Sequence, residues 1–237
     1  MNNTHIFDKD LNPILESAEN DDLNIIVQYL NKKISCTLEF EDAYKNHFPN
    51  HSKYADLIAK ELRDMGGNSF ANLFRGFEGP SYKEIVQDVA KKLKVSFNKN
   101  NDVPTIEKAI LSSILEKALS KMSDQEKEDL IRALGNKKNI VGAGPATTAA
   151  LIAAFNAGGF ASYQLTVIIA NQVARAILGS GLQVATNATI TRVASIVTGP
   201  IGWAIAGAWT AIDLAGPAYK VTIPSVIQVA MIRMKLE

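Results

Sequence analysis

The first 138 residues repeat apolar side chains at the spacing of amphipathic helices. Between residues 52 and 67, Tyr54, Leu57, Ile58 and Leu62 fall on one face of a helix. Similar patterns predict further helices within residues 10–18, 21–33, 68–76, 81–95, 103–122 and 123–135. No run of alternating apolar and polar residues indicates a strand. The chain is therefore predicted to be all-α.

Local signals mark where some of these helices begin and end. Ser81 follows Pro80 and stands three positions before Glu84, a spacing typical of the capping box that starts a helix. Gly66 and Gly67 end the pattern that begins at Ser52, and glycine is common just past a helix C-terminus. The polar run NKNND at 98–102 predicts a loop.

The chemistry of the chain changes near Asn139. The chain has 25 Lys and Arg and 24 Asp and Glu, but only five of these bases and two of these acids follow Asn139. The charged residues after it are Arg175, Arg192, Asp213, Lys220, Arg233, Lys235 and Glu237. We therefore expect a charged helical coat around an apolar, Gly/Ala-rich C-terminal helical hairpin. Three regions follow from this pattern: an N-terminal helical module (1–48), a charged helical region (49–138) and an apolar helical region (139–237).

Two uncharged windows, 139–174 and 194–212, are long enough to cross a bilayer, which takes about 20 residues. The first is mostly Ala and Gly with several amides and hydroxyls, so it is a marginal span. The second carries Trp203 and Trp209, aromatic residues suited to a membrane interface. Its candidates for contact with lipid are Trp203, Trp209, Ile201 and Ile205.

Small residues recur every four positions in the second window. Gly202 pairs with Ala206 and Gly207 with Ala211, a spacing that lets helices approach closely. Homo-oligomerisation through these faces is one interpretation, and tight packing inside a soluble helical bundle is the other. A charged helical coat around an apolar hairpin is also the arrangement that pore-forming colicins have before they insert into a membrane. The comparison is one of physical type only, because no colicin motif occurs here.

No catalytic or cofactor-binding pattern stands out. The sequence around Gly142 and Gly144 resembles a nucleotide-binding turn, but no Asp or Glu occurs between 139 and 212 and no strand–helix unit follows. Three histidines and the single Cys36 make no recognisable metal site. A net charge of +1 gives no reason to expect a nucleic-acid partner. We therefore expect a protein that is not an enzyme and has no cofactor or metal.

The N-terminus has neither a basic segment nor an apolar core, so it does not predict a secretory signal. This favours a cytoplasmic location, with membrane association left open.

Two stretches resemble a known family. Residues 61–95 contain GGNSFAN followed by RG, and residues 216–233 close with YKVTIPSVIQVA. Both are similar to motifs of the YaaW-like family of uncharacterised bacterial proteins, with Gln228, Val229 and Ala230 in place of that family's QIA. The positions that match the motifs are Gly66, Gly67, Asn68, Ser69, Arg75, Gly76, Tyr219, Thr222, Ile223 and Pro224.

The resemblance implies a helical fold and no catalysis, because the family is grouped with chaperone-type proteins of ubiquinol–cytochrome c reductase assembly. Turn and cap chemistry already accounts for most motif residues, although Arg75 could also bind an anionic partner. Pro224 is expected to start the last helix, whose apolar face would contain Val226, Ile227, Ala230 and Met231.

Two functions remain in competition. In the first, which we favour at this stage, the hairpin at about 140–212 associates with or inserts into membrane, so the partner is lipid. In the second, the same segment is permanent core, and the chain is a soluble chaperone-like or adaptor protein that binds another protein. The length of the uncharged stretches favours the first, and the family grouping favours the second.

Overall fold

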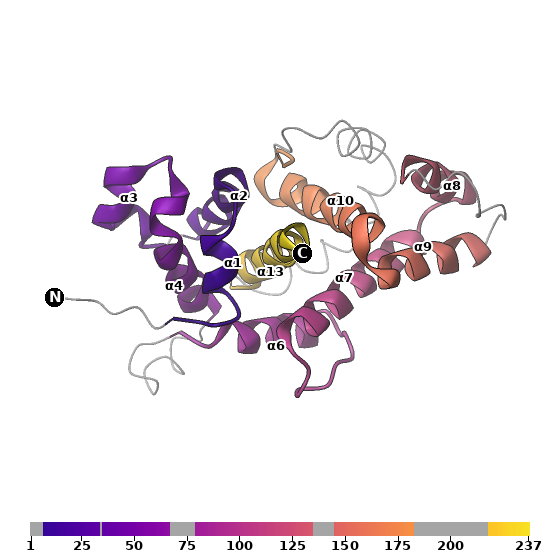
Figure 1. Ribbon diagram of the computed structural model, residues 1–237, viewed down its shortest axis with the longest axis horizontal. Coiled ribbons are helices and arrows are strands. Elements are labelled where there is room, and N and C mark those ends of the chain that lie inside the picture. The colour runs from indigo at the N-terminus through magenta and orange to yellow at the C-terminus, as the bar shows by residue number, and fades with distance from the viewer. Residues whose placement is uncertain (1–6, 34, 67–78, 135–144, 183–217) are drawn as a thin grey trace. The chain divides into compact units, whose positions relative to one another are not determined.

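A computed structural model describes residues 7–33, 35–66, 79–134, 145–182 and 218–237 (Figure 1). All regular elements within these ranges are helices, and no strand occurs among them. The all-α prediction is confirmed. The chain forms two compact units, one of residues 1–107 with 215–237 and the other of residues 108–214. These units group residues by contact, so the three regions expected from composition stay a prediction.

The first unit is built from short helices of the N-terminal half and the last helix of the chain. Its elements are α1 (Asn12–Glu16), α2 (Asn20–Asn31), η1 (Leu38–Phe40), α3 (Asp42–His47), η2 (His51–Tyr54), α4 (Ala55–Gly66), α6 (Tyr82–Lys92) and α13 (Tyr219–Leu236). Helix α7 (Val103–Leu119) begins in this unit, and the boundary between the units lies within it at Glu107.

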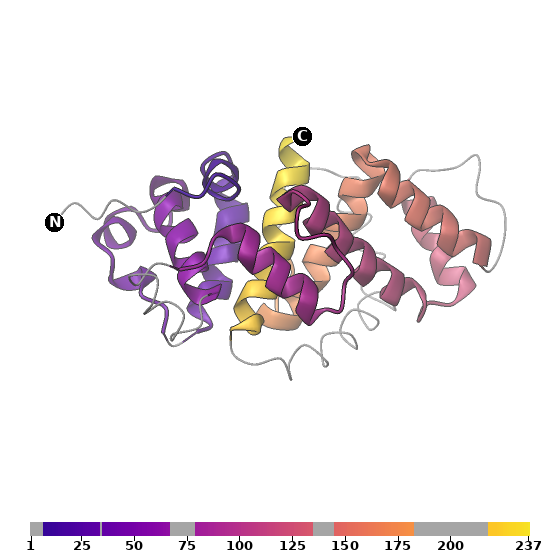
Figure 2. The same ribbon diagram turned by 90° about the horizontal axis from the view of Figure 1, so that it is seen from below.

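Helix α13 lies at the centre of the first unit. It contacts α1, α2, α4 and α6, and Figure 2 shows it in yellow among them. Every residue from Val221 to Ile232 is buried. Around it, the apolar faces of the other helices supply fully buried side chains such as Leu15, Ile26, Ile58 and Val86. The core therefore forms from segments at the two ends of the chain.

Two details of α13 differ from expectation. The prediction that Pro224 starts the helix is wrong, because the helix begins at Tyr219 and holds Pro224 inside it. Proline lacks the N–H that would bond to the carbonyl four residues earlier. The predicted apolar face of Val226, Ile227, Ala230 and Met231 is buried, but so is the rest of the circumference, because four helices surround this one.

The capping signals of the sequence are reproduced. The Ser81 hydroxyl accepts from the Glu84 N–H, the Glu84 carboxylate accepts from the Ser81 N–H, and α6 begins immediately afterwards. Residues 95–101 form a loop after α6, as the polar run predicts. Gly66 is the last residue of α4 rather than a cap beyond it. The described residues do not include the helix predicted at 68–76 or the motif residues Gly67, Asn68, Ser69, Arg75 and Gly76.

The second unit contains α8 (Asp124–Ala133), α9 (Pro145–Ala157) and α10 (Gly159–Leu178). Helix α9 packs against α8 and α10, and Leu151 and Phe155 are fully buried. Gly158 separates α9 from α10, which begins at Gly159. These two glycines have φ angles of 79° and 70°, a conformation that favours glycine. The glycine loop before Pro145 and the whole second uncharged window, with Ile201, Trp203, Ile205 and Trp209, lie outside the described residues.

Within the described residues, no single helix has both the length and the apolarity needed to cross a membrane. One bent pair, Thr147–Ala157 with Gly159–Leu178, meets the criteria of length and composition when taken together, with an angle of 107° between its halves.

Gly79 brings the chain close to α4. A Cβ at this position would lie 2.5 Å from the carbonyl carbon of Arg63 and 2.7 Å from the amide nitrogen of Asp64. Both are backbone atoms of a helix, so neither can move aside cheaply. The approach lets the Gly79 carbonyl accept a hydrogen bond from Arg63.

We expect Gly79→Ala to destabilise the fold by about 1–3 kcal/mol, because the added methyl group must displace helix backbone. Urea unfolding followed by circular dichroism measures the change. Ser96→Ala, at an exposed loop position, is the control and should leave the unfolding midpoint nearly unchanged. Equal midpoints for wild type and Gly79→Ala would contradict the close approach.

Candidate functional site

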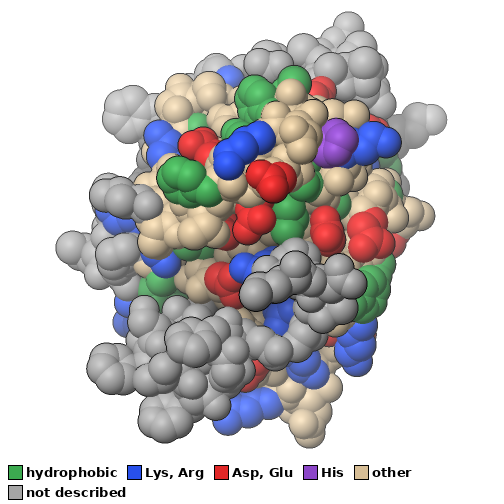
Figure 3. Space-filling model, turned by 90° about the vertical axis from the view of Figure 1, so that its left-hand side faces the viewer, with side chains coloured by type: hydrophobic (Ala, Val, Ile, Leu, Met, Phe, Trp, Pro, Cys, Tyr) green, Lys and Arg blue, Asp and Glu red, His purple; other side chains and the backbone are tan. Residues whose placement is uncertain are grey.

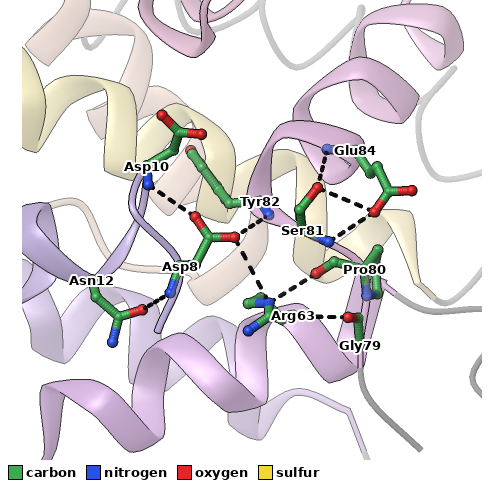
Figure 4. A network of polar contacts seen from close by, with 9 residues as sticks. All are labelled: Asp8, Asp10, Asn12, Arg63, Gly79, Pro80, Ser81, Tyr82 and Glu84. Atoms are coloured by element: carbon green, nitrogen blue, oxygen red, sulfur yellow. Dashed lines mark hydrogen bonds and ion pairs between the residues drawn. The ribbon is translucent and has the colours of Figure 1, made fainter. Parts of the chain in front are cut away.

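The first unit holds a network of buried charged and polar side chains, which is the strongest candidate for a site. Its first part is centred on Asp8, which precedes α1 and is 7% exposed. The Asp8 carboxylate accepts from the backbone N–H of Tyr82 at 2.7 Å and from that of Asp10 at 2.9 Å (Figure 4). Because Tyr82 is the first residue of α6, the carboxylate also lies at the positive end of that helix.

Arg63 of α4 completes this first part. Its Nε lies 3.8 Å from an Asp8 carboxylate oxygen and donates to the Pro80 carbonyl at 2.9 Å, and its Nη2 donates to the Gly79 carbonyl at 3.1 Å (Figure 4). One guanidinium therefore fixes the segment that leads into α6. Asn12 supports Asp8 by accepting a hydrogen bond from its N–H at 2.9 Å.

The second part of the network joins α6, α7 and α13. Glu107 is 2% exposed, and its two carboxylate oxygens have different partners. The Tyr82 hydroxyl donates to one at 2.7 Å, and Arg233 Nε donates to the other at 2.8 Å. Arg233 also donates to the Asp10 carbonyl at 2.8 Å. Tyr82 thus belongs to both parts, through its backbone N–H and its hydroxyl.

The environment makes these groups poor acid–base catalysts. Burial, together with the neighbouring Glu107 charge, raises the pKa of the Tyr82 hydroxyl well above its usual value. Burial also raises the pKa of Glu107, and the opposing charge of Arg233 counteracts this effect. Both carboxylate oxygens of Glu107 already accept hydrogen bonds. The arrangement is suited to holding helices together.

A second buried cluster surrounds His51 of η2, which is 1% exposed. Its Nδ1 lies 2.6 Å from the Tyr54 hydroxyl and its Nε2 lies 3.1 Å from the Asn24 side-chain oxygen. Its backbone N–H donates to Asn20 at 2.6 Å. Burial lowers the pKa of His51, so the neutral ring is favoured. The cluster fixes η2 against α2.

Other candidate groups are also bonded within the fold. The Glu61 carboxylate accepts from the N–H and the hydroxyl of Thr37 at 2.9 and 2.8 Å. Burial raises the pKa of Cys36 to about 11, so its thiol is not an activated nucleophile. Among the described residues, no group of three His, Cys, Asp or Glu side chains could hold a metal ion.

The surface of the first unit carries exposed aromatic side chains around α3. Phe40 is 74% exposed and Phe48 is 57% exposed. Between them in sequence, Tyr44 stacks on Phe48 with 5.3 Å between ring centroids. On the face drawn in Figure 3, hydrophobic side chains lie in small groups among charged ones. Phe40, Tyr44 and Phe48, spaced four residues apart, are referred to below as the aromatic stripe.

The motif residues of the closing segment have surroundings typical of residues that stabilise the fold. Thr222 and Ile223 are buried in α13, and the Thr222 hydroxyl donates to the Ala218 carbonyl at 3.2 Å. Tyr219 is half-buried beneath the ammonium group of Lys92. None of the described motif residues joins the Asp8–Glu107 network, and their part in partner binding stays a prediction.

Sequence reasoning missed Asp8, Tyr82, Glu107 and Arg233. A partial signal exists in VPTIEKAIL, where Glu107 is the one acid among apolar residues that recur with helical spacing. A buried acid requires a partner, but the sequence alone does not identify Arg233, 126 positions away.

The chain matches the family model described as Ubiquinol-cytochrome C chaperone over residues 50–227. It is 44% identical to a UPF0174 protein of Helicobacter pylori strain J99, over 98% of this chain and 93% of that protein. A second protein of that strain, also described as UPF0174, is 40% identical over 82% of this chain and 94% of its own length. The UPF0174 protein YaaW of Escherichia coli K12 is 32% identical, over 85% and 81% respectively. No solved structure matches the chain.

Replacing Arg233 should test the buried ion pair. Arg233→Met leaves the Glu107 charge buried without its counter-ion, so we expect a loss of about 3–5 kcal/mol in the free energy of unfolding. Adding Glu107→Gln removes that charge, so the double variant should be more stable than the two separate losses would predict. Urea unfolding of wild type, the two single variants and the double variant gives the free energies of this double-mutant cycle.

Arg132→Met is the matched control, because Arg132 is 66% exposed where it pairs with Glu128 and Asp129. We expect it to cost less than about 1 kcal/mol. Strict additivity of Glu107→Gln and Arg233→Met would show that the two groups do not interact.

The His51 cluster predicts a pH dependence of stability. Because burial lowers the pKa of His51 from 6.5, the unfolded chain binds more protons than the folded protein below that pH. The contribution of His51 to the free energy of unfolding therefore decreases as pH falls through 6.5 towards the folded pKa. His51→Gln should flatten this part of the stability profile, measured as unfolding midpoint against pH. His47→Gln, at an exposed position, should leave it unchanged; an equal effect of both would refute the assignment.

Proposed function

The chain belongs to the UPF0174 family, and from this premise we propose that it is a non-catalytic, chaperone-type helical protein that binds a protein partner. The observation that carries the proposal is the extent of the family match. Residues 50–227 run from just before η2 to the middle of α13, so the similarity covers most of the core rather than one short motif. The printed description of that family names a chaperone, and only this class of function is carried over.

The chemistry of the described residues supports a non-catalytic role. Tyr82, Glu107 and His51 are the buried titratable groups that an enzyme would most readily use. Each has its hydrogen-bonding atoms occupied by neighbouring protein groups. Such groups stabilise the first unit and leave little capacity to bind or transfer a proton to a substrate.

The aromatic stripe is the surface that we propose contacts the partner. Exposed large apolar side chains often mark protein-binding surfaces, and aromatic anchors contribute much of the binding energy at interfaces. Burial of Phe40 and Phe48 contributes little to the stability of the fold, because more than half of each residue is exposed to solvent. Burial against a partner would remove that apolar area from water.

Site-specific photo-crosslinking in the cells that produce the protein tests this proposal. A photoreactive phenylalanine analogue replaces Phe40 or Phe48, and irradiation should give a discrete protein adduct at both positions. The analogue at Phe7, which is 59% exposed but outside the stripe, is the matched control and should give none. Phe40→Ser should then reduce the adduct formed from position 48, while the melting temperature stays close to that of wild type.

Absence of adducts at both stripe positions would contradict the proposed surface. The same adducts from position 7 would indicate nonspecific contact and would also contradict the proposed surface. Mass spectrometry of the adduct identifies the partner where the proposal holds.

A second candidate function is association of the apolar C-terminal segment with membrane. The bent pair of α9 and α10 favours it by length and composition. In this candidate Trp203 and Trp209 contact lipid, and the small-residue faces allow homo-oligomers. Both candidates assume a cytoplasmic protein. Retention in membranes after a carbonate wash would support insertion, and complete release would exclude it.

A further inference from the structure

Among the described residues of the first unit, three buried side-chain polar atoms have no hydrogen-bond partner. They are the Tyr29 hydroxyl of α2 and, on α13, the Ser225 hydroxyl and the Gln228 side-chain oxygen. Each of these residues is at most 1% exposed, so bulk solvent does not reach them. A buried polar group without a partner loses the hydrogen bonds that it makes to water in the unfolded chain. The three atoms therefore require a partner that the protein itself does not supply.

Helices α2 and α13 are in contact and run antiparallel. Lys235, near the end of α13, pairs with Glu19 and Asp22 at the start of α2, both at 2.8 Å. Two turns earlier on α13, the Gln228 Nε2 donates to the Asp22 carbonyl at 3.4 Å. Residues later in α2 therefore face residues earlier in α13.

This register brings the three unpaired atoms to the same level of the interface. Tyr29 is seven residues after Asp22, so it lies on the face of α2 that meets α13. Side chains lean towards the N-terminus of their helix, which directs the Tyr29 ring back towards the level of Gln228. Ser225 is three residues before Gln228 and lies on the same side of α13. No hydrogen bond joins the three atoms to one another, so a bridging group is needed to satisfy them.

We propose that an ordered water molecule binds between α2 and α13 and bridges Tyr29, Ser225 and Gln228. A buried water typically makes about three hydrogen bonds to groups that are otherwise unsatisfied, and three such groups meet here. The Gln228 oxygen only accepts, whereas each hydroxyl can donate and accept, which matches the two donors and two acceptors of water. A cation would leave the hydroxyl protons unbonded, and an anion would be repelled by the Gln228 oxygen.

The site explains polar residues at the most buried positions of the central helix. Ser225 and Gln228 belong to the closing segment YKVTIPSVIQVA, and both are fully buried where α13 is surrounded by other helices. Burial raises the pKa of the Tyr29 hydroxyl above its usual value, so this group keeps its proton for donation. The inference goes beyond binding of a protein partner and does not depend on the aromatic stripe.

A crystal structure of the full chain, at a resolution that shows ordered solvent, tests the proposal. We expect a water about 2.8 Å from the Tyr29 and Ser225 hydroxyls and the Gln228 side-chain oxygen. The Tyr82 hydroxyl is the internal control, because it is equally buried but donates to Glu107 at 2.7 Å, so no water should bridge it to another helix. Direct hydrogen bonds among the three groups, or an interface filled by apolar side chains without a solvent peak, would overturn the proposal.

The variant Tyr29→Phe/Ser225→Ala/Gln228→Met tests the same site in solution. Each single substitution should lower the urea midpoint, because it leaves the water with fewer partners. The triple variant removes all partners together, so its midpoint should be higher than the three separate losses predict. Gln125→Met, at an exposed position, is the control and should leave the midpoint nearly unchanged. Strictly additive losses would contradict a shared bridging water.

Discussion

The buried contact of Glu107 with Arg233 and Tyr82 is the interaction on which the first unit depends. It joins α7 at the boundary between the two units to α13 and to the first turn of α6. A carboxylate that is 2% exposed is costly unless it is paired, and the ion pair with Arg233 and the hydrogen bond from Tyr82 offset that cost. Arg233 extends the contact to the Asp10 carbonyl, and Asp8 continues it to Arg63. The polar network therefore links four helices and the segment before α1.

This arrangement places the last helix of the chain at the centre of a unit whose other helices come from the first 107 residues. Helix α13 is surrounded by α1, α2, α4 and α6, so their apolar faces have no complete core until it is in position. Residues 108–214 are thus inserted between two parts of one folded unit.

Local features of the fold could be predicted from the sequence, whereas long-range features could not. The capping box of Ser81 and Glu84 and the helical spacing of Tyr54, Ile58 and Leu62 depend on neighbours within a few residues, and all are found. The start of α13 was misplaced because Pro224 is a local signal, which burial on every side of the helix overrides. The Asp8–Tyr82 and Glu107–Arg233 contacts join residues 74 and 126 positions apart. No single-sequence pattern encodes those pairings.

Helix α13 is the element whose presence defines the first unit, and amide hydrogen exchange measures this most directly. We expect the amides of Val226 to Ile232 to be among the slowest to exchange, and to do so with the same opening free energy as the buried residues of α4 and α6. Cooperative exchange of all three helices would confirm that the unit opens only as a whole. Exchange of α13 many times faster than that of α4 and α6 would contradict the account, because the closing helix would then leave a core that remains folded without it.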